Sequence, residues 1–412
     1  MRVLHLTPEL PYWPGGSGGA TRQFHLLRRL AGLGHEVTVV APYTSEQANG
    51  VPALADAGIR FEGLPRPGSQ VTESLLALGR EPRLALRAAS LPLLAWQVSV
   101  FWTALRPLAR RTASEWRPDV LSVEHDNAAG WAADLRGVPA VLTFQNVGWL
   151  YYRSRAAAAG GVARVAYDLE ARRFRRHDLR HVSRYRMLIA MSERDREDLE
   201  QATGGAVEVV PNGVASDELT PAGEAPDPPT LLFSGTMSHP PNAEGVLWFA
   251  ERIWPRVRSE VGDARLLVVG RDPPRSVRRL AGEDGIEVTG FVPSIAPYFA
   301  RSAAVVVPLL SGGGTRLKVL EAFAARRAVV STSVGVEGLE VRAGREVLVA
   351  DDAAGFAAAA IRLLRDRALR EELAAAGRAV AEERYDWRVL GERFAAVLEA
   401  ATGASLRRSS LR

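Results

Sequence analysis

The sequence predicts an α/β protein of two domains, each built on a parallel β-sheet covered by helices. Short valine-rich apolar runs alternate with helical stretches through the first half, and the same alternation returns after a proline-rich break at 214–229. The length of 412 residues is enough for each half to bury its own hydrophobic core.

Several of the strands expected in the first half are rich in valine and apolar on both faces, as in a sheet with helices on both sides. The expected strands are Val3–Thr7, Val37–Ala41, Val120–Val123, Ala140–Phe144, Leu188–Met191 and Val207–Val210. Between the first two, residues 20–33 have one apolar face, and Gly34 marks the expected helix end. This is a βαβ unit.

The second half predicts a second sheet of the same kind, with helices at 242–258 and 316–326 among its strands. The strands are Leu231–Ser234, Leu266–Val269, Ile286–Thr289, Ala304–Val307, Val329–Thr332 and Val347–Ala350. The predicted organisation is therefore a Rossmann-like domain at 1–213, a linker at 214–229 and a second Rossmann-like domain at 230–385. A helix at 386–400 is expected to pack back on the first domain, and 401–412 to be disordered.

Composition excludes several functions. The chain has no cysteine, so disulfides, thiolate catalysis and cysteine-bound zinc or iron–sulfur centres are excluded. Its formal net charge is +5, and Lys318 is the single lysine beside 51 arginines. No nucleic-acid recognition motif accompanies the arginines, which disfavours nucleic-acid binding. The first residues are typical of a strand rather than a secretion signal, so we expect a cytoplasmic protein.

A glycine-rich loop follows the first strand at 14–21 and leads into a helix. Glycines allow close approach of the backbone to a phosphate, and the free N–H groups of a helix start carry partial positive charge. The loop contains Gly16, Gly18 and Gly19 but matches neither dinucleotide-binding nor Walker motifs. The alternative interpretation is a flexible surface turn.

The second glycine-rich loop, at 311–315, gives a stronger signal. Gly313, Gly314 and Thr315 precede a helix whose first turn carries Arg316 and Lys318. A diphosphate held there would meet backbone donors and two fixed cations. Alternatively, Lys318 and Glu321 form a surface pair of about 0.2–0.5 kcal/mol.

These features together resemble the family 4, glycogen-synthase-like glycosyltransferases, over about residues 1–400. The resemblance implies the GT-B fold, in which two Rossmann-like domains face a central cleft. It also implies a retaining hexosyltransferase that uses a nucleotide-sugar donor. The matching segments are Gly15-Gly16, Pro211-Asn212-Gly213-Val214, Phe233-Ser234-Gly235-Thr236-Met237, Leu267-Val268-Val269-Gly270, Val288-Thr289-Gly290-Phe291-Val292 and Leu320-Glu321-Ala322.

The resemblance also implies roles for individual residues. Lys318, Arg316 and the loop 313–315 would hold the diphosphate, and Glu321 would accept hydrogen bonds from the ribose hydroxyls. Phe291 and Val292 would lie at the base, and His125 near the donor sugar. The remaining implied donor contacts are Gly16, Gly18, Gly19, Asn212 and Gly235. Without the resemblance, His125 is better explained as a packed loop histidine.

The sequence departs from the family pattern at two places. Gly313 stands where many members have a glutamate, and the arginine and lysine common after the first strand of the second domain are absent from 235–242. Arg316 and Lys318 are expected to supply the missing charge. No Asp-x-Asp sequence occurs in the chain, so we expect no metal and no cofactor besides the nucleotide-sugar substrate.

Two segments raise the question of a membrane. Residues 88–105 are uncharged, but their length is at the lower limit for a spanning helix, which favours a buried or surface-docking helix. The basic run 172–180 has interleaved apolar residues suited to anionic headgroups, although a solvated helix face is also consistent. We therefore expect peripheral contact with the inner face of the plasma membrane at most.

The leading functional prediction is a transferase in the synthesis of polysaccharide, lipopolysaccharide or glycolipid, with a glycan or lipid-linked acceptor. A sugar-nucleotide epimerase of the same architecture is an alternative, but it needs a close pair of acid and base carboxylates that the sequence does not assign. A non-catalytic sugar-nucleotide-binding protein is the other alternative, because of Gly313.

Overall fold

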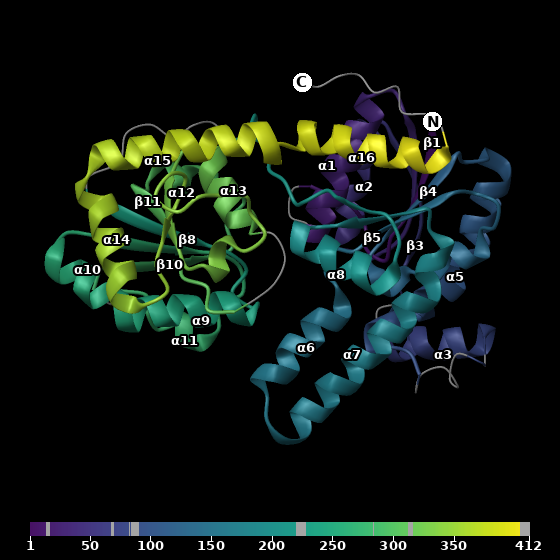
Figure 1. Cartoon of the computed structure of the whole chain (residues 1–412), viewed down its shortest axis with the longest axis horizontal. Coiled ribbons are helices and arrows are strands. Elements are labelled where there is room, and N and C mark those ends of the chain that lie inside the picture. The colour runs from purple at the N-terminus through teal and green to yellow at the C-terminus, as the bar shows by residue number, and fades with distance from the viewer. Residues whose placement is uncertain are drawn as a thin grey trace. The chain divides into compact units, whose positions relative to one another are not determined.

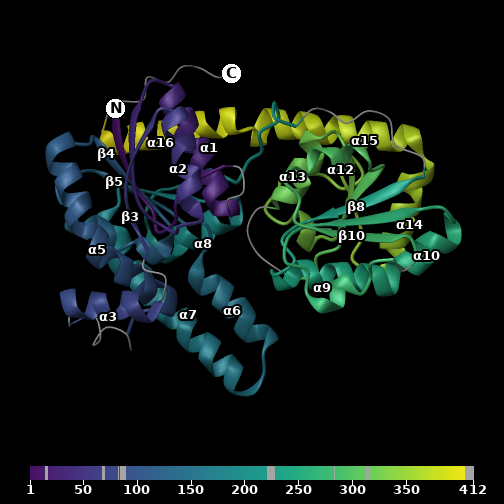
Figure 2. The same ribbon diagram turned by 180° about the vertical axis from the view of Figure 1, so that it is seen from behind.

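The computed structural model describes residues 1–13, 17–66, 70–81, 83, 90–219, 228–282, 284–311 and 316–403. These residues form two compact units, shown in Figures 1 and 2. The first unit comprises Met1–Pro211 together with the end of the chain from Leu390 onward. The second unit comprises Asn212–Val389.

Within the described residues, the first unit contains a seven-stranded parallel sheet in the order β3-β2-β1-β4-β5-β6-β7. The strands are β1 (Arg2–Leu6), β2 (Glu36–Tyr43), β3 (Ile59–Pro65), β4 (Val120–Glu124), β5 (Ala140–Thr143), β6 (Met187–Ala190) and β7 (Val207–Val209). In the central register, Val3 of β1 is opposite Val37 of β2 and Val120 of β4. All residues of β4 and β5 are buried, as a strand covered on both faces requires.

The helices of the first unit alternate with these strands. They are α1 (Gly18–Gly32), α2 (Val51–Asp56), α3 (Gln70–Arg80), α5 (Leu93–Trp116), α6 (Gly148–Ala158), α7 (Gly161–His181), α8 (Glu193–Thr203) and α16 (Trp387–Thr402), which belongs to this unit from Leu390 onward. Helix α16 is joined to the rest of the unit by Arg29 Nη2, which donates to Glu392 Oε1 at 2.6 Å, and by Arg186 Nη1, which donates to the carbonyl of Ala401 at 3.0 Å.

Helix α5 contains most of the uncharged segment 88–105, of which residues 88 and 89 lie outside the described residues. It is a core helix: Val98, Trp102 and Leu105 are buried, and Trp102 stacks on Trp131 with ring centroids 4.5 Å apart. Among the described residues, no helix is both long enough and apolar enough to cross a bilayer.

Helices α6 and α7 form an antiparallel hairpin that extends away from the sheet of the first unit (Figures 1 and 2). Its base is held by Phe174, whose ring stacks on Tyr152 at 5.4 Å and occupies the space where a Cβ on Gly148 would lie. The absence of a side chain at Gly148 therefore allows the two helices to approach closely.

The second unit contains a six-stranded parallel sheet within the described residues, in the order β10-β9-β8-β11-β12-β13. The strands are β8 (Thr230–Ser234), β9 (Arg265–Val269), β10 (Ile286–Gly290), β11 (Ala304–Val307), β12 (Ala328–Ser331) and β13 (Leu348–Val349). Its helices are α9 (Pro240–Trp248), the π-helical turn η5 (Phe249–Ile253), α10 (Trp254–Glu260), α11 (Arg275–Arg278), α12 (Ala296–Ala300), α13 (Leu317–Ala324), α14 (Ala353–Arg365) and α15 (Arg367–Val380).

Both sheets reverse their strand order at one point, between β1 and β4 in the first unit and between β8 and β11 in the second. In open parallel sheets, ligands bind beyond the carboxyl ends of the strands at such a reversal. The residues that follow β1 and β4, and those that follow β8 and β11, are therefore the places to look for a site in each unit.

Candidate donor site

Glycines occupy the carboxyl ends of three adjacent strands in the second unit. Gly235 follows β8 and donates its N–H to the carbonyl of Val269 at 3.0 Å. Gly270 follows β9 and donates to the carbonyl of Gly290 at 3.0 Å. A Cβ on Gly235 would lie 2.9 Å from Lys318 Nζ, and one on Gly270 only 1.7 Å from the Gly235 oxygen. The glycines therefore let these strand ends and the lysine approach closely.

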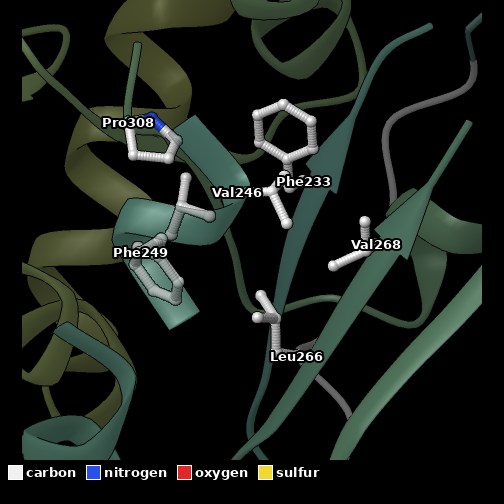
Figure 3. A pocket seen from close by; sticks show the side chains of 7 residues that line it. Phe233, Val246, Phe249, Leu266, Val268 and Pro308 are labelled. Carbon is white, nitrogen blue, oxygen red and sulfur yellow. The ribbon is translucent and has the colours of Figure 1, made fainter. Parts of the chain in front are cut away.

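Lys318, in the first turn of α13, extends to this edge of the sheet. Its Nζ donates to Asn242 Oδ1 at 2.6 Å and lies 4.2 Å from the centroid of the Phe233 ring. Phe233 also belongs to the apolar core, where its ring packs with Val246 and Leu266 in a space that admits no water (Figure 3). The ammonium is thus positioned by an amide oxygen and by an aromatic face fixed in the core.

The electrostatic environment of Lys318 favours an anionic ligand. Burial lowers the pKa of its ammonium to about 7, with the charge of Arg316 acting in the same direction and that of Glu321 opposing it. Burial also lowers the pKa of His239, and the charges of Lys318 and Arg316 lower it further. A bound diphosphate would supply negative charge beside this half-buried ammonium and favour its charged form.

Glu321 lies three residues after Lys318 in α13 and is the acidic side chain of the cluster. Burial raises the pKa of its carboxyl to about 7, while the charge of Lys318 opposes that rise. The lysine ammonium donates to Asn242 and interacts with Glu321 through its charge, without an ion-pair contact between the two. This arrangement differs from the surface pair of Lys318 and Glu321 that the sequence left open as an alternative, because the lysine bonds to Asn242 instead.

Arg316 directly precedes α13 and is buried. Its Nε donates to the carbonyl of Val334 at 3.1 Å, and its Nη2 lies 3.8 Å from Glu337 Oε2. Burial lowers the pKa of the guanidinium, and the charge of Glu337 opposes that shift. Arg316 therefore ties the start of α13 to the segment after β12, in addition to the positive charge that it brings near Lys318.

Asn242 is a site residue that sequence reasoning missed. Its Nδ2 donates to the carbonyl of Thr236 at 2.8 Å, which leaves Oδ1 directed at Lys318. Asn242 sits in the first turn of α9, whose start is set by Pro240 and Pro241. The sequence does carry one signal for this residue, because two prolines mark a helix start shortly after the end of β8. From the sequence alone, this segment was considered only for the arginine and lysine that it lacks.

Replacing Asn242 is expected to move the pH dependence of donor use. Donor kcat/KM reports the free enzyme, so it should fall above about pH 7 as Lys318 loses its proton. Asn242→Ala removes an acceptor that favours the charged amine, so the fall should begin about one pH unit lower. Asn242→Asp adds negative charge and should move the fall to higher pH. Superimposable profiles for the three proteins would show that Asn242 does not act on Lys318.

Three further predicted donor residues lie in the second unit. Phe291 follows β10 and is 63% exposed, and Arg271 Cζ lies 5.4 Å from the centroid of its ring. Val292 packs partly against the core. Because Gly290 is hydrogen bonded to Gly270, Phe291 lies at the same sheet edge as the glycine row. Asn212 is the first residue of the second unit and is half-buried.

In the first unit, the segment after β1 is built around Glu9. Ser17 caps α1, its hydroxyl accepting from the N–H of Ala20 at 3.0 Å and donating to Glu9 Oε2 at 3.0 Å. A Cβ on Gly19 would lie 2.6 Å from Glu9 Oε1 and 2.5 Å from Gln145 Oε1. Gly18 and Gly19 thus form the first turn of α1, and Gly19 permits a close approach of two polar side chains.

His125 directly follows β4 and has a φ of +72°, which is rare for a residue other than glycine. Its Nε2 lies 3.4 Å from Glu9 Oε1. Burial acts to lower its pKa, but the hydrogen bond to Glu9 and the charges of Glu9 and Glu124 outweigh it, so the pKa is raised. The structure therefore joins His125 to the loop after β1 through Glu9, a second residue that sequence reasoning missed.

The other predicted donor residues, Gly16, Gly313, Gly314 and Thr315, lie outside the described residues. Within the part of the chain that is described, no group of three or more histidine or acidic side chains is arranged to hold a metal ion.

Two family models match this chain, one in each half. The family model described as Glycosyltransferase Family 4 matches residues 16–218, and the one described as Glycosyl transferases group 1 matches residues 228–366. The chain belongs to the family 4, group 1 glycosyltransferases. The first match lies almost wholly in the first unit, and the second match lies within the second unit.

Individual relatives of this family 4 glycosyltransferase extend the comparison. A phosphatidyl-myo-inositol mannosyltransferase of Mycobacterium leprae is 33% identical over 221 residues, which are 51% of this chain and 58% of the relative. The match therefore spans little more than half of that relative's length.

Solved structures show the GT-B fold of the whole chain. Sucrose-phosphate synthase from Thermosynechococcus elongatus has a TM-score of 0.70 at 17% identity, with 98% of this chain and 100% of that chain covered. The Anabaena HepE protein, solved in complex with UDP and glucose, has a TM-score of 0.66 at 14% identity, with 97% and 99% covered.

Proposed function

We propose that this protein transfers a sugar from a nucleotide-diphosphate donor to a glycan or lipid-linked acceptor, with retention of anomeric configuration, in the synthesis of cell-surface glycans. The observation that carries the proposal is the half-buried ammonium of Lys318, fixed beside the glycine-ended strands at the ligand-binding edge of a Rossmann-like sheet. Such a group suits the diphosphate that leaves when a nucleotide sugar is cleaved.

The proposed mechanism assigns a task to each side chain of the second unit. As the bond between the sugar and the β-phosphate breaks, negative charge grows on the phosphate oxygen. Lys318 is held by Asn242 and Phe233, so it stabilises that charge without reorganising. The carboxylate of Glu321 accepts hydrogen bonds from the ribose hydroxyls, and Phe291 lies beside the base.

Known relatives support the donor and acceptor classes. One relative is named a phosphatidyl-myo-inositol mannosyltransferase, and one solved neighbour holds UDP and glucose. We infer by analogy that the donor here is a nucleoside-diphosphate hexose and that a lipid-linked acceptor is used. Metal independence and a cytoplasmic location stay predictions.

The test is turnover of labelled UDP-glucose and GDP-mannose by the full chain, with phosphatidylinositol or a bacterial lipid extract as acceptor. The proposal predicts label in the acceptor, an unchanged anomeric configuration in the product by NMR, and undiminished activity in EDTA. Label recovered in an epimeric nucleotide sugar would support the epimerase instead. A thermal shift with every donor but no turnover would identify a binding protein and overturn the proposal.

A further inference from the structure

Among the residues that the structure describes, one face of α7 carries a row of exposed side chains. Val162, Val165 and Leu169 are 87%, 67% and 48% exposed, and the exposed Arg172, Arg176 and Arg180 continue the same line. Successive spacings of three or four residues place all six on one helical face, which we call the α7 stripe. The opposite face is the packed one, since Ala171, Phe174 and Asp178 are buried.

The hairpin that carries the stripe also holds the net charge of the whole chain. Residues 148–181 contain eight arginines and three acidic residues, a net charge of +5, equal to the formal net charge of all 412 residues. The rest of the chain is therefore neutral overall. Around the tip, from Arg155 to Tyr167, there is no acidic residue.

We propose that the α7 stripe docks this protein on an anionic lipid bilayer. Amphipathic helices that lie in a membrane interface combine a row of apolar side chains with arginines that reach the phosphates. In the stripe, Val162, Val165 and Leu169 enter the acyl boundary, while Arg172, Arg176 and Arg180 contact anionic headgroups. The hairpin extends away from the sheet (Figures 1 and 2), and the side chains of the stripe are exposed.

The charge pattern distinguishes this occupant from others. A second copy of the chain packed stripe to stripe would bring three more arginines against Arg172, Arg176 and Arg180, and like charges repel. A nucleic acid would contact the arginines but would leave the exposed Val162 and Val165 without an apolar partner. A bilayer with anionic lipid satisfies both halves of the stripe. This inference does not use the nucleotide site, so the result of its test is independent of the test of the proposed function.

The test is co-sedimentation of the full chain with vesicles of phosphatidylcholine alone or with 30% phosphatidylglycerol. We expect binding to the anionic vesicles only. Arg172→Gln/Arg176→Gln should weaken it about 25-fold, since each arginine near an anionic surface contributes roughly fivefold. Val162→Asp/Val165→Asp should weaken it about tenfold or more. All these positions are exposed, so the variants should keep the melting temperature of the parent.

The matched control is Arg252→Gln/Arg256→Gln, which removes two exposed arginines of the second unit, also four residues apart, and should bind like the parent. Equal binding to both vesicle types, or unchanged binding of the hairpin variants, would overturn the proposal. Formation of a dimer that Val162→Asp/Val165→Asp abolishes would assign the stripe to a second copy. A gel shift with RNA in place of vesicle binding would assign it to nucleic acid.

Discussion

Replacing Lys318 with alanine is expected to lower the rate of sugar transfer about 100- to 1,000-fold, or about 2.7–4 kcal/mol in the barrier. The reason is that its ammonium, fixed 2.6 Å from Asn242 Oδ1, meets charge that grows only as the glycosidic bond breaks. The change should appear mainly in kcat. An increase in KM of the same size with kcat unchanged would mean that Lys318 contributes only to ground-state binding.

Two further substitutions separate charge from shape at this position. Lys318→Met keeps most of the side-chain volume without the charge and should be as impaired as Lys318→Ala. Lys318→Arg keeps the charge, but a planar guanidinium is larger than an ammonium, and Nζ already lies 4.2 Å from the Phe233 ring centroid and 2.9 Å from an ideal Cβ on Gly235. It should therefore recover only part of the activity. Full activity in Lys318→Arg would show that charge alone is sufficient.

Glu321→Ala is expected to weaken binding of the nucleoside diphosphate about 100-fold or more. Two hydrogen bonds from ribose hydroxyls to a carboxylate contribute roughly 1.5–3 kcal/mol each. Calorimetry with UDP and GDP measures the effect. The exposed Glu244 of α9 supplies a control, since Glu244→Ala removes an acidic group from the surface of the same unit. Unchanged affinity in Glu321→Ala would remove this carboxylate from the ribose site.

The sheets could be predicted from sequence because their strands are valine-rich and buried on both faces. This pattern can be recognised within each short segment, without knowing which distant segments it contacts. Strand β3 was missed for the converse reason. It lies at the edge of its sheet, is partly exposed, and contains Gly63 and ends at Pro65, which weaken a strand signal. The helix predicted at 242–258 is interrupted in the structure by the π-helical turn η5, which the apolar periodicity did not indicate.

The site was predictable where it follows a local signal and unpredictable where it depends on distant partners. Lys318 could be singled out because it follows a glycine-rich loop and is the single lysine. Asn242 could not, because its contact with Lys318 joins residues 76 apart in the chain. Glu9 was missed in the same way, since its partner His125 is brought beside it by the pairing of β1 with β4.

The membrane question shows the same division. Apolar composition drew attention to 88–105, yet α5 buries that segment's Val98, Trp102 and Leu105 within the first unit. From the sequence alone, the basic run at 172–180 was also consistent with a solvated helix face. Only the fold shows that its exposed arginines continue a line of exposed valine and leucine side chains on α7.

Amine labelling of the full chain, with and without saturating UDP or GDP, tests most directly the claim that Lys318 holds the leaving diphosphate. Lys318 is the single lysine, so an amine-reactive reagent modifies its Nζ and the N-terminus, which peptide mass spectrometry resolves. Burial lowers the pKa of Lys318 to about 7, so the free amine reacts at neutral pH. Bound diphosphate should raise that pKa and slow labelling of Lys318 about tenfold or more, without affecting Met1. Equal labelling rates at Lys318 with and without saturating diphosphate would contradict the account.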